Sequence, residues 1–493
     1  MKEFRSINKR DLHLAALLFA LSLFFYITTL AEKPCLGDSP ELAANAILGK
    51  VLHPPGYPLY ALLLRGISAL PLGSYALKCG LLSCIFGALS VSLFYLLARF
   101  IHCEVFASAA AALLFAISTE QWILSTRIEV YTMELGLALL FLLLFLLNAE
   151  TNLISQGDFL ICLVFTSALL HRWNALLLIP PLFLYLFFSC PKKRKALRGI
   201  RMVKGISGII LAFTPYLYFF FLDFHSPLIY GYEKASFSKV VFGDGKYMDY
   251  LVLPFQEGSL ESLLGLITTL ASQAQFIGLV AALLGWISLV HYGRQPASNI
   301  LLAYSFLHSI FLWSYPVDDV STMILPTWSI VALGWAGLLS IWPQQKWAGL
   351  KRSKTSNKVI VLAMLFLLLL WWNTPLHRNA NSTALFEVMT EFHEDLPKKA
   401  LVFTHRSDES KLFCLYYVNE LIGPRKDLRY ISYKFSSLRE EIDKLRSIVT
   451  KARSRGRRVY FSILFPSLQE NFHLSPRGPY SEVLGLRRDE KKD

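Results

Sequence analysis

Long apolar stretches, separated by short polar segments, fill the first three quarters of the chain. The hydrocarbon core of a bilayer is about 30 Å thick, so a helix that crosses it needs about 20 apolar residues. Residues 261–271 predict a half-span or an interfacial helix. Eleven other stretches meet or approach the full length, and each predicts a membrane-spanning helix: 12–30, 77–101, 104–118, 131–148, 158–171, 173–189, 203–222, 274–292, 299–315, 322–342 and 357–372.

The pattern changes after the last of these stretches. Charged residues recur every few positions from 373 to 493, and the apolar runs become shorter. The segments KKALVFTH, LRYISYKF and RRVYFSILF predict strands, whereas ESKLFCLYYVNEL and SLREEIDKLRSIVTKARSR predict amphipathic helices. Alternating strands and helices are typical of an α/β domain. We therefore predict two domains: a polytopic α-helical membrane domain over 1–372 and a small α/β domain over 373–493.

Composition agrees with a membrane protein and excludes an ordinary soluble one. Hydrophobic residues make up 54% of the 493 positions and charged residues only 17%, and the mean hydropathy is +0.45. The net charge of +14 would suit a nucleic-acid-binding protein. However, the basic residues form short clusters beside apolar stretches, as they do at the cytoplasmic ends of membrane spans. We expect membrane lipid, and no nucleic acid, as a partner.

The basic clusters also orient the chain, because Lys and Arg crowd cytoplasmic loops. We place the N-terminus inside and expect an uncleaved first span, since EKPCLG follows it rather than a small-residue cleavage site. With eleven spans, the basic loops 191–201 and 346–358 also fall inside. The segments that fall outside hold most of the carboxylates and histidines: 31–75, 119–131, 171–173, 223–258, 314–321 and the α/β domain. The short, repeat-free tail favours a bacterial inner membrane with an extracytoplasmic active site.

The first external loop, 31–75, contains the polar stretch GDSPELAANAILGKVLHPPGYP. Asp38 and Glu41 are three positions apart, so a helix that starts near Pro40 places them near one face of its first turn. Asp38 is our candidate general base, and Glu41 would orient an acceptor or tune Asp38 by like-charge repulsion. The alternative is that Asp38 only caps the helix. His53 is a candidate for binding phosphate or acceptor, or a structural residue at the proline break.

The external cations Arg65, Arg127 and Arg172 are candidates for binding a phosphate, because guanidinium groups suit bidentate phosphate contacts. We favour Arg127 or Arg172. Arg127 has the alternative of a simple ion pair with the nearby Glu129, and Arg172 could merely reach the membrane interface.

Three further residues are candidates for substrate binding. His171 precedes Arg172 in a short turn between two predicted spans. Asp318 and Asp319 could bind an acceptor or a divalent ion, although two adjacent loop acids are more often simply solvated. We therefore expect no metal site.

Two parts of the chain resemble a known family. GDSPELAANAILGKVLHPPGYPLYALL (37–63) is similar to the signature of a family of multi-spanning proteins that includes the eukaryotic O-mannosyltransferase of plexin-type receptors. Asp38 and Glu41 match its acidic D-x-x-E element, and the segment 53–58, with Tyr57, matches its H-P-P-G-Y-P element. Residues 396–433 resemble the family's segment after the last span, and YPVDDVSTMILP is a weaker third match.

This resemblance implies a glycosyltransferase of the GT-C type. Such an enzyme moves a sugar, here mannose-like, from a polyprenyl-phosphate donor to a hydroxyl acceptor on the extracytoplasmic face, with inversion. An acidic residue of the first external loop typically serves as the base, which is Asp38 here. Tyr57 joins the substrate-binding candidates. The implied partners are the lipid-linked donor and a protein Ser or Thr or a glycan acceptor, and no other cofactor is implied.

Two other classes of protein remain as alternatives. A transporter would suit eleven spans, but transporters usually carry ionisable residues near mid-membrane, and the predicted spans are nearly free of them. A non-catalytic envelope assembly protein would use the α/β domain to bind a partner. Chemistry at Asp38 would exclude it.

Overall fold

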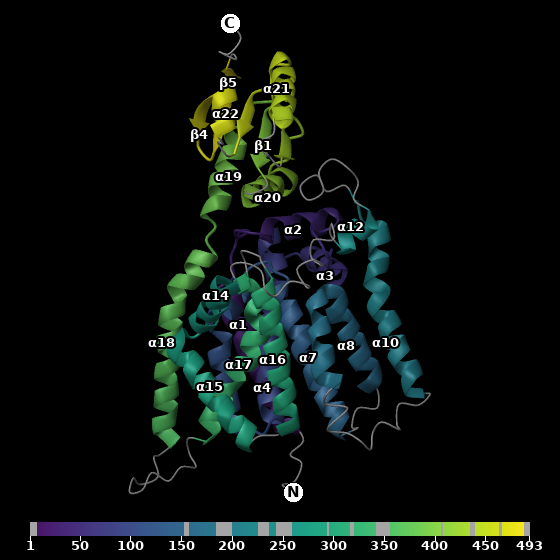
Figure 1. The fold of residues 1–493 in the computed structure, drawn as a ribbon, viewed down its shortest axis with the longest axis vertical. Helices are drawn as coiled ribbons and strands as arrows, with labels where there is room; N and C mark the ends of the chain where they lie inside the picture. The colour runs from purple at the N-terminus through teal and green to yellow at the C-terminus, as the bar shows by residue number, and fades with distance from the viewer. Residues whose placement is uncertain are drawn as a thin grey trace.

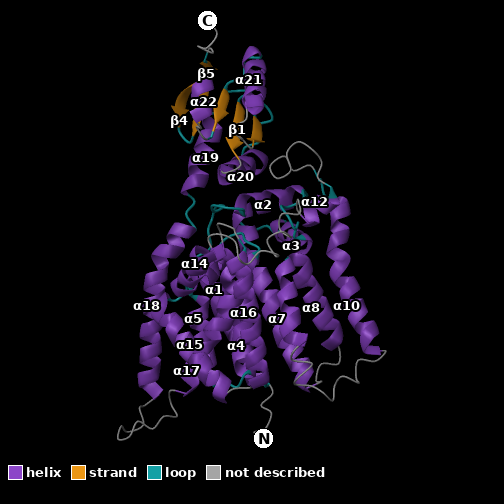
Figure 2. Ribbon diagram, in the orientation of Figure 1, coloured by secondary structure: helices purple, strands orange, loops and turns teal. Residues whose placement is uncertain are grey.

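The computed structural model describes residues 7–151, 157–183, 200–224, 236–242, 259–292, 295–315, 320–341, 355–405, 408–433, 439–462 and 466–487. Long helices form a bundle, and a small mixed sheet with its own helices lies beyond one end of that bundle (Figures 1 and 2). The N-terminus lies at the opposite end (Figure 1).

Each predicted span overlaps a helix. The stretch 173–189 begins with η1 (Trp173–Leu178) and passes out of the described residues after 183. The long helices are α1 (Lys9–Thr28), α4 (Tyr75–Phe100), α5 (Val105–Ala116), α7 (Tyr131–Thr151), α8 (Gly157–His171), α10 (Ile200–Leu217), α15 (Gln275–Tyr292), α16 (Gln295–Ser314), α17 (Leu325–Ile341) and α18 (Thr355–Ala380).

Several of these helices could cross a membrane. In the described ranges, five helices have the required length and apolar composition, or seven if each of two bent helix pairs forms one span. These helices make the chain an integral membrane protein, whereas the number of eleven spans stays a prediction. Helix α18 continues through position 372, where we predicted the domain boundary.

Small residues and buried ion pairs hold the bundle together. Helices α15 and α17 cross where Gly334 meets the backbone carbonyl of Ala282, and a Cβ at Gly334 would collide with that oxygen. Close approach through glycine is a common way for apolar helices to pack in lipid. Helices α1 and α4 are joined by Asp11 and Arg99, whose Oδ1 and Nε atoms lie 2.8 Å apart.

Short helices form a layer between the bundle and the sheet. At this end of the bundle, Figure 1 shows α2 (Ser39–Leu48), α3 (Pro58–Ser68), α12 (Phe237–Phe242) and α14 (Ser259–Ser272). The short helix η3 (Tyr218–Phe221) contacts α3, and η4 (Val320–Ile324) contacts α14 and α6 (Thr119–Ser125).

Hydrogen bonds join distant segments within this layer. The Ala31 amide donates to the Thr126 carbonyl (3.0 Å) and the Asp223 amide donates to the Gly49 carbonyl (2.9 Å). These bonds join the described parts of three segments that we predicted to be external, 31–75, 119–131 and 223–258. The helices α2 and α3 of the first segment lie at the end of the bundle opposite the N-terminus (Figure 1).

The C-terminal part contains a five-stranded sheet in the order β2-β1-β3-β5-β4. The three predicted strands are present as β1 (Leu401–His405), β2 (Arg429–Tyr433) and β3 (Val459–Phe461), and they are parallel. The antiparallel pair β4 (Phe472–Arg477) and β5 (Tyr480–Leu486) extends the sheet and was not predicted.

Helices cover both faces of this sheet. Val402 and Tyr460 pack on the side of α19 (Ala384–Asp395), α20 (Glu409–Tyr417) and its π-helical continuation η6 (Val418–Ile422). Phe403 and Phe461 pack on the side of α21 (Arg439–Ser454) and α22 (Pro466–Asn471). Helix α20 lies at the edge of this part nearest to α2 (Figure 1).

Candidate active site

Asp38 stands immediately before α2 with a partly exposed side chain. It occupies the N-cap position, but its φ of −81° and ψ of −10° are helical, and within the described part of the chain its side chain makes no capping hydrogen bond. Pro40 in the first turn removes one backbone donor that a cap would satisfy. The Asp38 side chain is 40% exposed. The carboxylate is therefore not occupied by the capping role that we held as the alternative.

The buried Glu41 and the partly exposed His53 form a pair next to Asp38. The Glu41 side chain is fully buried, and its Oε2 lies 2.9 Å from His53 Nδ1. The other ring nitrogen, Nε2, lies 3.6 Å from Asp38 Oδ2. The second Glu41 oxygen accepts a 2.7 Å hydrogen bond from the amide of Asn45, one turn along the same helix. The imidazole thus contacts both acids, one through each nitrogen.

This arrangement makes His53 a cation at neutral pH. Burial by itself would lower the pKa of His53, but the negative charges of Asp38, Glu41 and Glu129 and the hydrogen bond to Glu41 raise it to about 9. We expected Glu41 to act on Asp38 by like-charge repulsion. In the structure, a positive ring contacts both carboxylates instead.

The segment 53–58 turns the chain so that His53 returns to the first turn of α2. The Pro54–Pro55 peptide bond is cis, and Gly56 has φ 83°. A Cβ at Gly56 would lie 2.8 Å from the Phe219 ring and 2.9 Å from Val240, so only glycine fits without movement. Tyr57 follows with φ 41° and precedes α3.

Tyr57 connects His53 to His171. The Tyr57 ring centroid is 5.3 Å from each of the two histidine rings. His171 ends α8, is buried, and its Nε2 lies 3.0 Å from the Val130 carbonyl oxygen. The structure therefore brings three of the predicted substrate-binding residues into one row beside Asp38.

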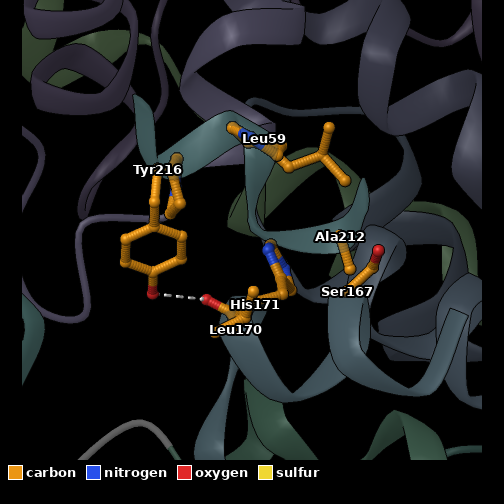
Figure 3. A pocket seen from close by; sticks show the side chains of 8 residues that line it. Leu59, Ser167, Leu170, His171, Ala212 and Tyr216 are labelled. Carbon is orange, nitrogen blue, oxygen red and sulfur yellow. Dashed lines mark hydrogen bonds between the residues drawn. The ribbon is translucent and has the colours of Figure 1, made fainter. Parts of the chain in front are cut away.

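A small pocket lies at the His171 end of this row. Figure 3 shows the His171 ring among the lining side chains of α3, α8 and α10, with the Tyr216 hydroxyl donating to the Leu170 carbonyl at 3.3 Å. The remaining lining residues are mostly apolar: Pro58, Leu59, Ser167, Ala212 and Pro215.

Arg127 and Glu129 lie beside the segment that leads to Asp38. The Ser39 hydroxyl donates to the Ile128 carbonyl at 2.8 Å, which attaches α2 to this loop. Arg127 Nη2 is 3.5 Å from Glu129 Oε1, as in the ion-pair alternative. Its Nε is buried and has no hydrogen-bond partner among the described residues. Glu129 Oε1 would lie 4.0 Å from a Cβ at Gly37.

Arg172 is held more firmly within the fold. Its Nε lies 3.2 Å from Glu134 Oε2, its guanidinium carbon is 4.8 Å from the Tyr131 ring centroid, and its Nη2 contacts the Met323 sulfur at 3.3 Å. Glu134 belongs to α7 and also accepts a hydrogen bond from the Asn174 amide. The same amide nitrogen lies 3.3 Å from Nε2 of the buried His308 of α16. The predicted spans therefore hold more buried ionisable groups than we expected.

Two predicted residues, Asp318 and Asp319, lie outside the described residues. Within the described ranges, no group of three or more His, Cys, Asp or Glu side chains is placed to hold a metal ion.

Sequence reasoning missed two features of this site. Asn45 stands four positions after Glu41, so helical spacing could have predicted its hydrogen bond. Glu129 was considered only as a partner for Arg127, and no local pattern relates it to Gly37 or His53.

Comparisons of sequence identify a domain. Residues 38–196 match the family model described as Protein O-mannosyl-transferase TMEM260 N-terminal domain. Mouse protein O-mannosyl-transferase TMEM260 is 36% identical over 118 residues, which are 24% of this chain and 17% of the mouse protein. The matched segment is thus a small part of that protein.

Comparisons of structure identify the fold. ArnT from Cupriavidus metallidurans bound to undecaprenyl phosphate superposes with a TM-score of 0.63 at 11% identity, over 95% of this chain and 97% of ArnT. The Archaeoglobus fulgidus oligosaccharyltransferase in complex with Zn and sulfate has a TM-score of 0.51 at 14% identity, over 92% of this chain and 68% of that one. Likeness at such identities concerns the fold alone. The chain has the fold of GT-C membrane glycosyltransferases, and its residues 38–196 match the TMEM260 N-terminal domain family, in agreement with the resemblance seen in the sequence.

Proposed function

We propose that this protein is a membrane glycosyltransferase that moves a mannose-like sugar from a polyprenyl-phosphate donor to a hydroxyl acceptor such as a protein serine or threonine. One observation carries the proposal. Asp38 presents a partly exposed carboxylate that caps no helix within the described chain, held against a cationic His53 that a buried Glu41 supports. This arrangement stands in the segment that matches an O-mannosyltransferase family.

The reaction needs a base for the acceptor and positive charge for the leaving group. Asp38 removes the acceptor's hydroxyl proton as that oxygen attacks C1 of the sugar. The bond from C1 to the phosphate oxygen breaks with inversion, and polyprenyl phosphate leaves with the electron pair. Fixed cations stabilise the charge that grows on this phosphate.

His53 and Arg127 are the cations that we assign to the phosphate. His53 is charged at neutral pH because its pKa is about 9. Arg127 is bound to one carboxylate at 3.5 Å and keeps a buried Nε without a partner in the described chain. Arg172 is better explained as a structural cation, since Glu134, Tyr131 and Met323 all contact it.

A polyprenyl-phosphate donor agrees with the fold and with the position of the site. ArnT, which shares the fold, is bound to undecaprenyl phosphate in its structure. Asp38 directly precedes α2, and α2 lies at the end of the helix bundle opposite the N-terminus (Figure 1). With the N-terminus inside, this end and the sheet face the extracytoplasmic side of a bacterial inner membrane. Tyr57 and His171 would line the substrate site next to His53.

The test compares cells that lack the gene with cells that express the wild type, Asp38→Asn or Glu32→Gln. Mass spectrometry of surface glycoproteins and glycans identifies the sugar that is missing without the gene. Purified membranes then measure its transfer from the polyprenyl-phosphate donor. Loss of a general base lowers rates by about 10²–10⁴-fold, so we expect this loss for Asp38→Asn at equal expression.

Glu32→Gln is the matched control, because Glu32 is an exposed carboxylate of the same loop. We expect it to transfer sugar at the wild-type rate. Transfer at the wild-type rate by Asp38→Asn would show that Asp38 is not the base. If deletion of the gene removes no sugar from any surface molecule, the proposed activity is wrong and a transporter or assembly role becomes the better hypothesis.

A further inference from the structure

Helix α2 is enclosed on every side. All residues from Ser39 to Ala46 are buried, including the small side chains Ala43 and Ala44. A helix at the surface of a bundle would expose one face to water. The outer face of α2 is covered because α20 of the C-terminal part packs against it (Figure 1).

Helix α20 is enclosed in the same way. We predicted an amphipathic helix here, yet every residue from Leu412 to Val418 is buried. One side of α20 packs against the sheet, and the other side meets the first external loop. The buried residues of α2 and α20 belong to one continuous hydrophobic cluster. The C-terminal part therefore shares a hydrophobic core with the helix that carries the candidate site. Such an interface is more apolar than a usual contact between two mobile domains.

One polar contact joins the two helices at their ends. Lys50, two residues after α2, donates a 2.7 Å hydrogen bond from Nζ to the Tyr416 hydroxyl, and the same ammonium lies 5.2 Å from the Tyr416 ring centroid. Burial and the charges of Glu420, Glu41 and Asp223 raise the pKa of Tyr416, so its hydroxyl stays neutral and can accept this bond.

We infer that Tyr416 is a positioning residue of the active site, which fixes α2 through Lys50 and thereby holds Glu41 and His53 in place for Asp38. The inference rests on the proposed function and extends the site to the C-terminal part. Tyr416 touches no reacting group in this scheme. It acts because a displacement of about 1 Å at a catalytic group can lower a rate about 100-fold.

The decisive variants are Tyr416→Phe and Lys50→Met, alone and together. Tyr416→Phe keeps the ring and removes only the hydroxyl that Lys50 contacts. We expect each single variant to lower the turnover number about tenfold or more, within the range known for misplaced groups, and to leave KM for the donor nearly unchanged. Because the two side chains act as one pair, the double variant should lose no more than either single variant.

Lys33→Ala is the matched control. Lys33 also joins the first loop to the C-terminal part, through a 2.8 Å ion pair with Glu387 of α19. Both side chains of this pair are about half exposed, at 47% and 52%. Exposed ion pairs contribute little, so Lys33→Ala should keep the wild-type turnover number.

Amide hydrogen exchange of the peptide 39–48 in the purified full-length protein, without substrate, separates this inference from the proposed function. Faster exchange of this peptide in Tyr416→Phe, and not in Lys33→Ala, is expected even if the transferred sugar has not been identified. If exchange in Tyr416→Phe equals that of the wild type, Tyr416 does not hold α2 and the inference is wrong. A fall in turnover without faster exchange would overturn it as well, because Tyr416 would then act by another route.

Discussion

Replacing Glu41 by glutamine removes the buried negative charge beside His53 and keeps the size of the side chain. In the wild type, Glu41 accepts a hydrogen bond from Asn45 at 2.7 Å and faces His53 Nδ1 at 2.9 Å. Glutamine offers one acceptor and one donor. It can keep both contacts only if its amide N–H donates to an unprotonated Nδ1, so the substitution favours neutral His53.

The size of the effect follows from the pKa of His53. It rises from an ordinary value of 6.5 to about 9 in the folded protein. That difference corresponds to roughly 3 kcal/mol of folding free energy. Because the folded-state pKa is raised, this stabilisation is complete below pH 6.5 and is lost as the pH rises through about 9. Asp38 and Glu129 still act on His53 in the variant, so ~3 kcal/mol is the upper limit of the change.

The assay is denaturant-induced unfolding in detergent micelles between pH 6 and 10 for the wild type, Glu41→Gln, His53→Gln and the double variant. We expect the wild type to exceed Glu41→Gln by up to ~3 kcal/mol at pH 6, and this difference to shrink toward pH 10. In the His53→Gln background, the change in unfolding free energy caused by Glu41→Gln should no longer depend on pH. A difference between wild type and Glu41→Gln that is constant over this pH range would refute the assignment of a charged His53.

Two glycine substitutions test the packing that supports the site. Gly56→Ala should destabilise the protein by about 2–4 kcal/mol, since positive φ strain adds to overpacking against the Phe219 ring. Gly456→Ala, at φ +71° with no described atom within 4 Å, should show the strain alone in the same unfolding assay. Gly334→Ala should force α15 and α17 apart and lower the unfolding temperature clearly. Gly66→Ala changes a helical position with open space around it, so it should leave the unfolding temperature unchanged. If Gly334→Ala and Gly66→Ala unfold at the same temperature, the close crossing of α15 and α17 is contradicted.

Local patterns predicted the elements that depend on a single segment. Each apolar stretch overlaps a helix in the described residues, because apolar side chains and internal backbone hydrogen bonds suit a bilayer at any position in the bundle. The strands β1, β2 and β3 were predicted from their own alternation. The β4–β5 pair was not, because SPRGP interrupts its pattern and Pro476 stands within β4.

The candidate site was partly predictable for the same reason. Asp38, Glu41 and His53 belong to one loop, so a short helix and a proline turn are enough to bring them together. The pairing of Arg172 with Glu134 joins positions 38 apart in the chain, and no local pattern indicates it.

The sequence by itself determined the membrane-spanning character, the strand-and-helix composition of the tail and the loop that carries the candidate base. These features follow from periodicity and motif spacing, which act over a few residues. Only the tertiary structure decided three features: within the described residues the Asp38 carboxylate does not cap α2, His53 contacts both acids, and α20 covers the outer face of α2. Those outcomes depend on which distant surfaces are buried against each other, because burial sets both the charge of a histidine and the exposed face of a helix.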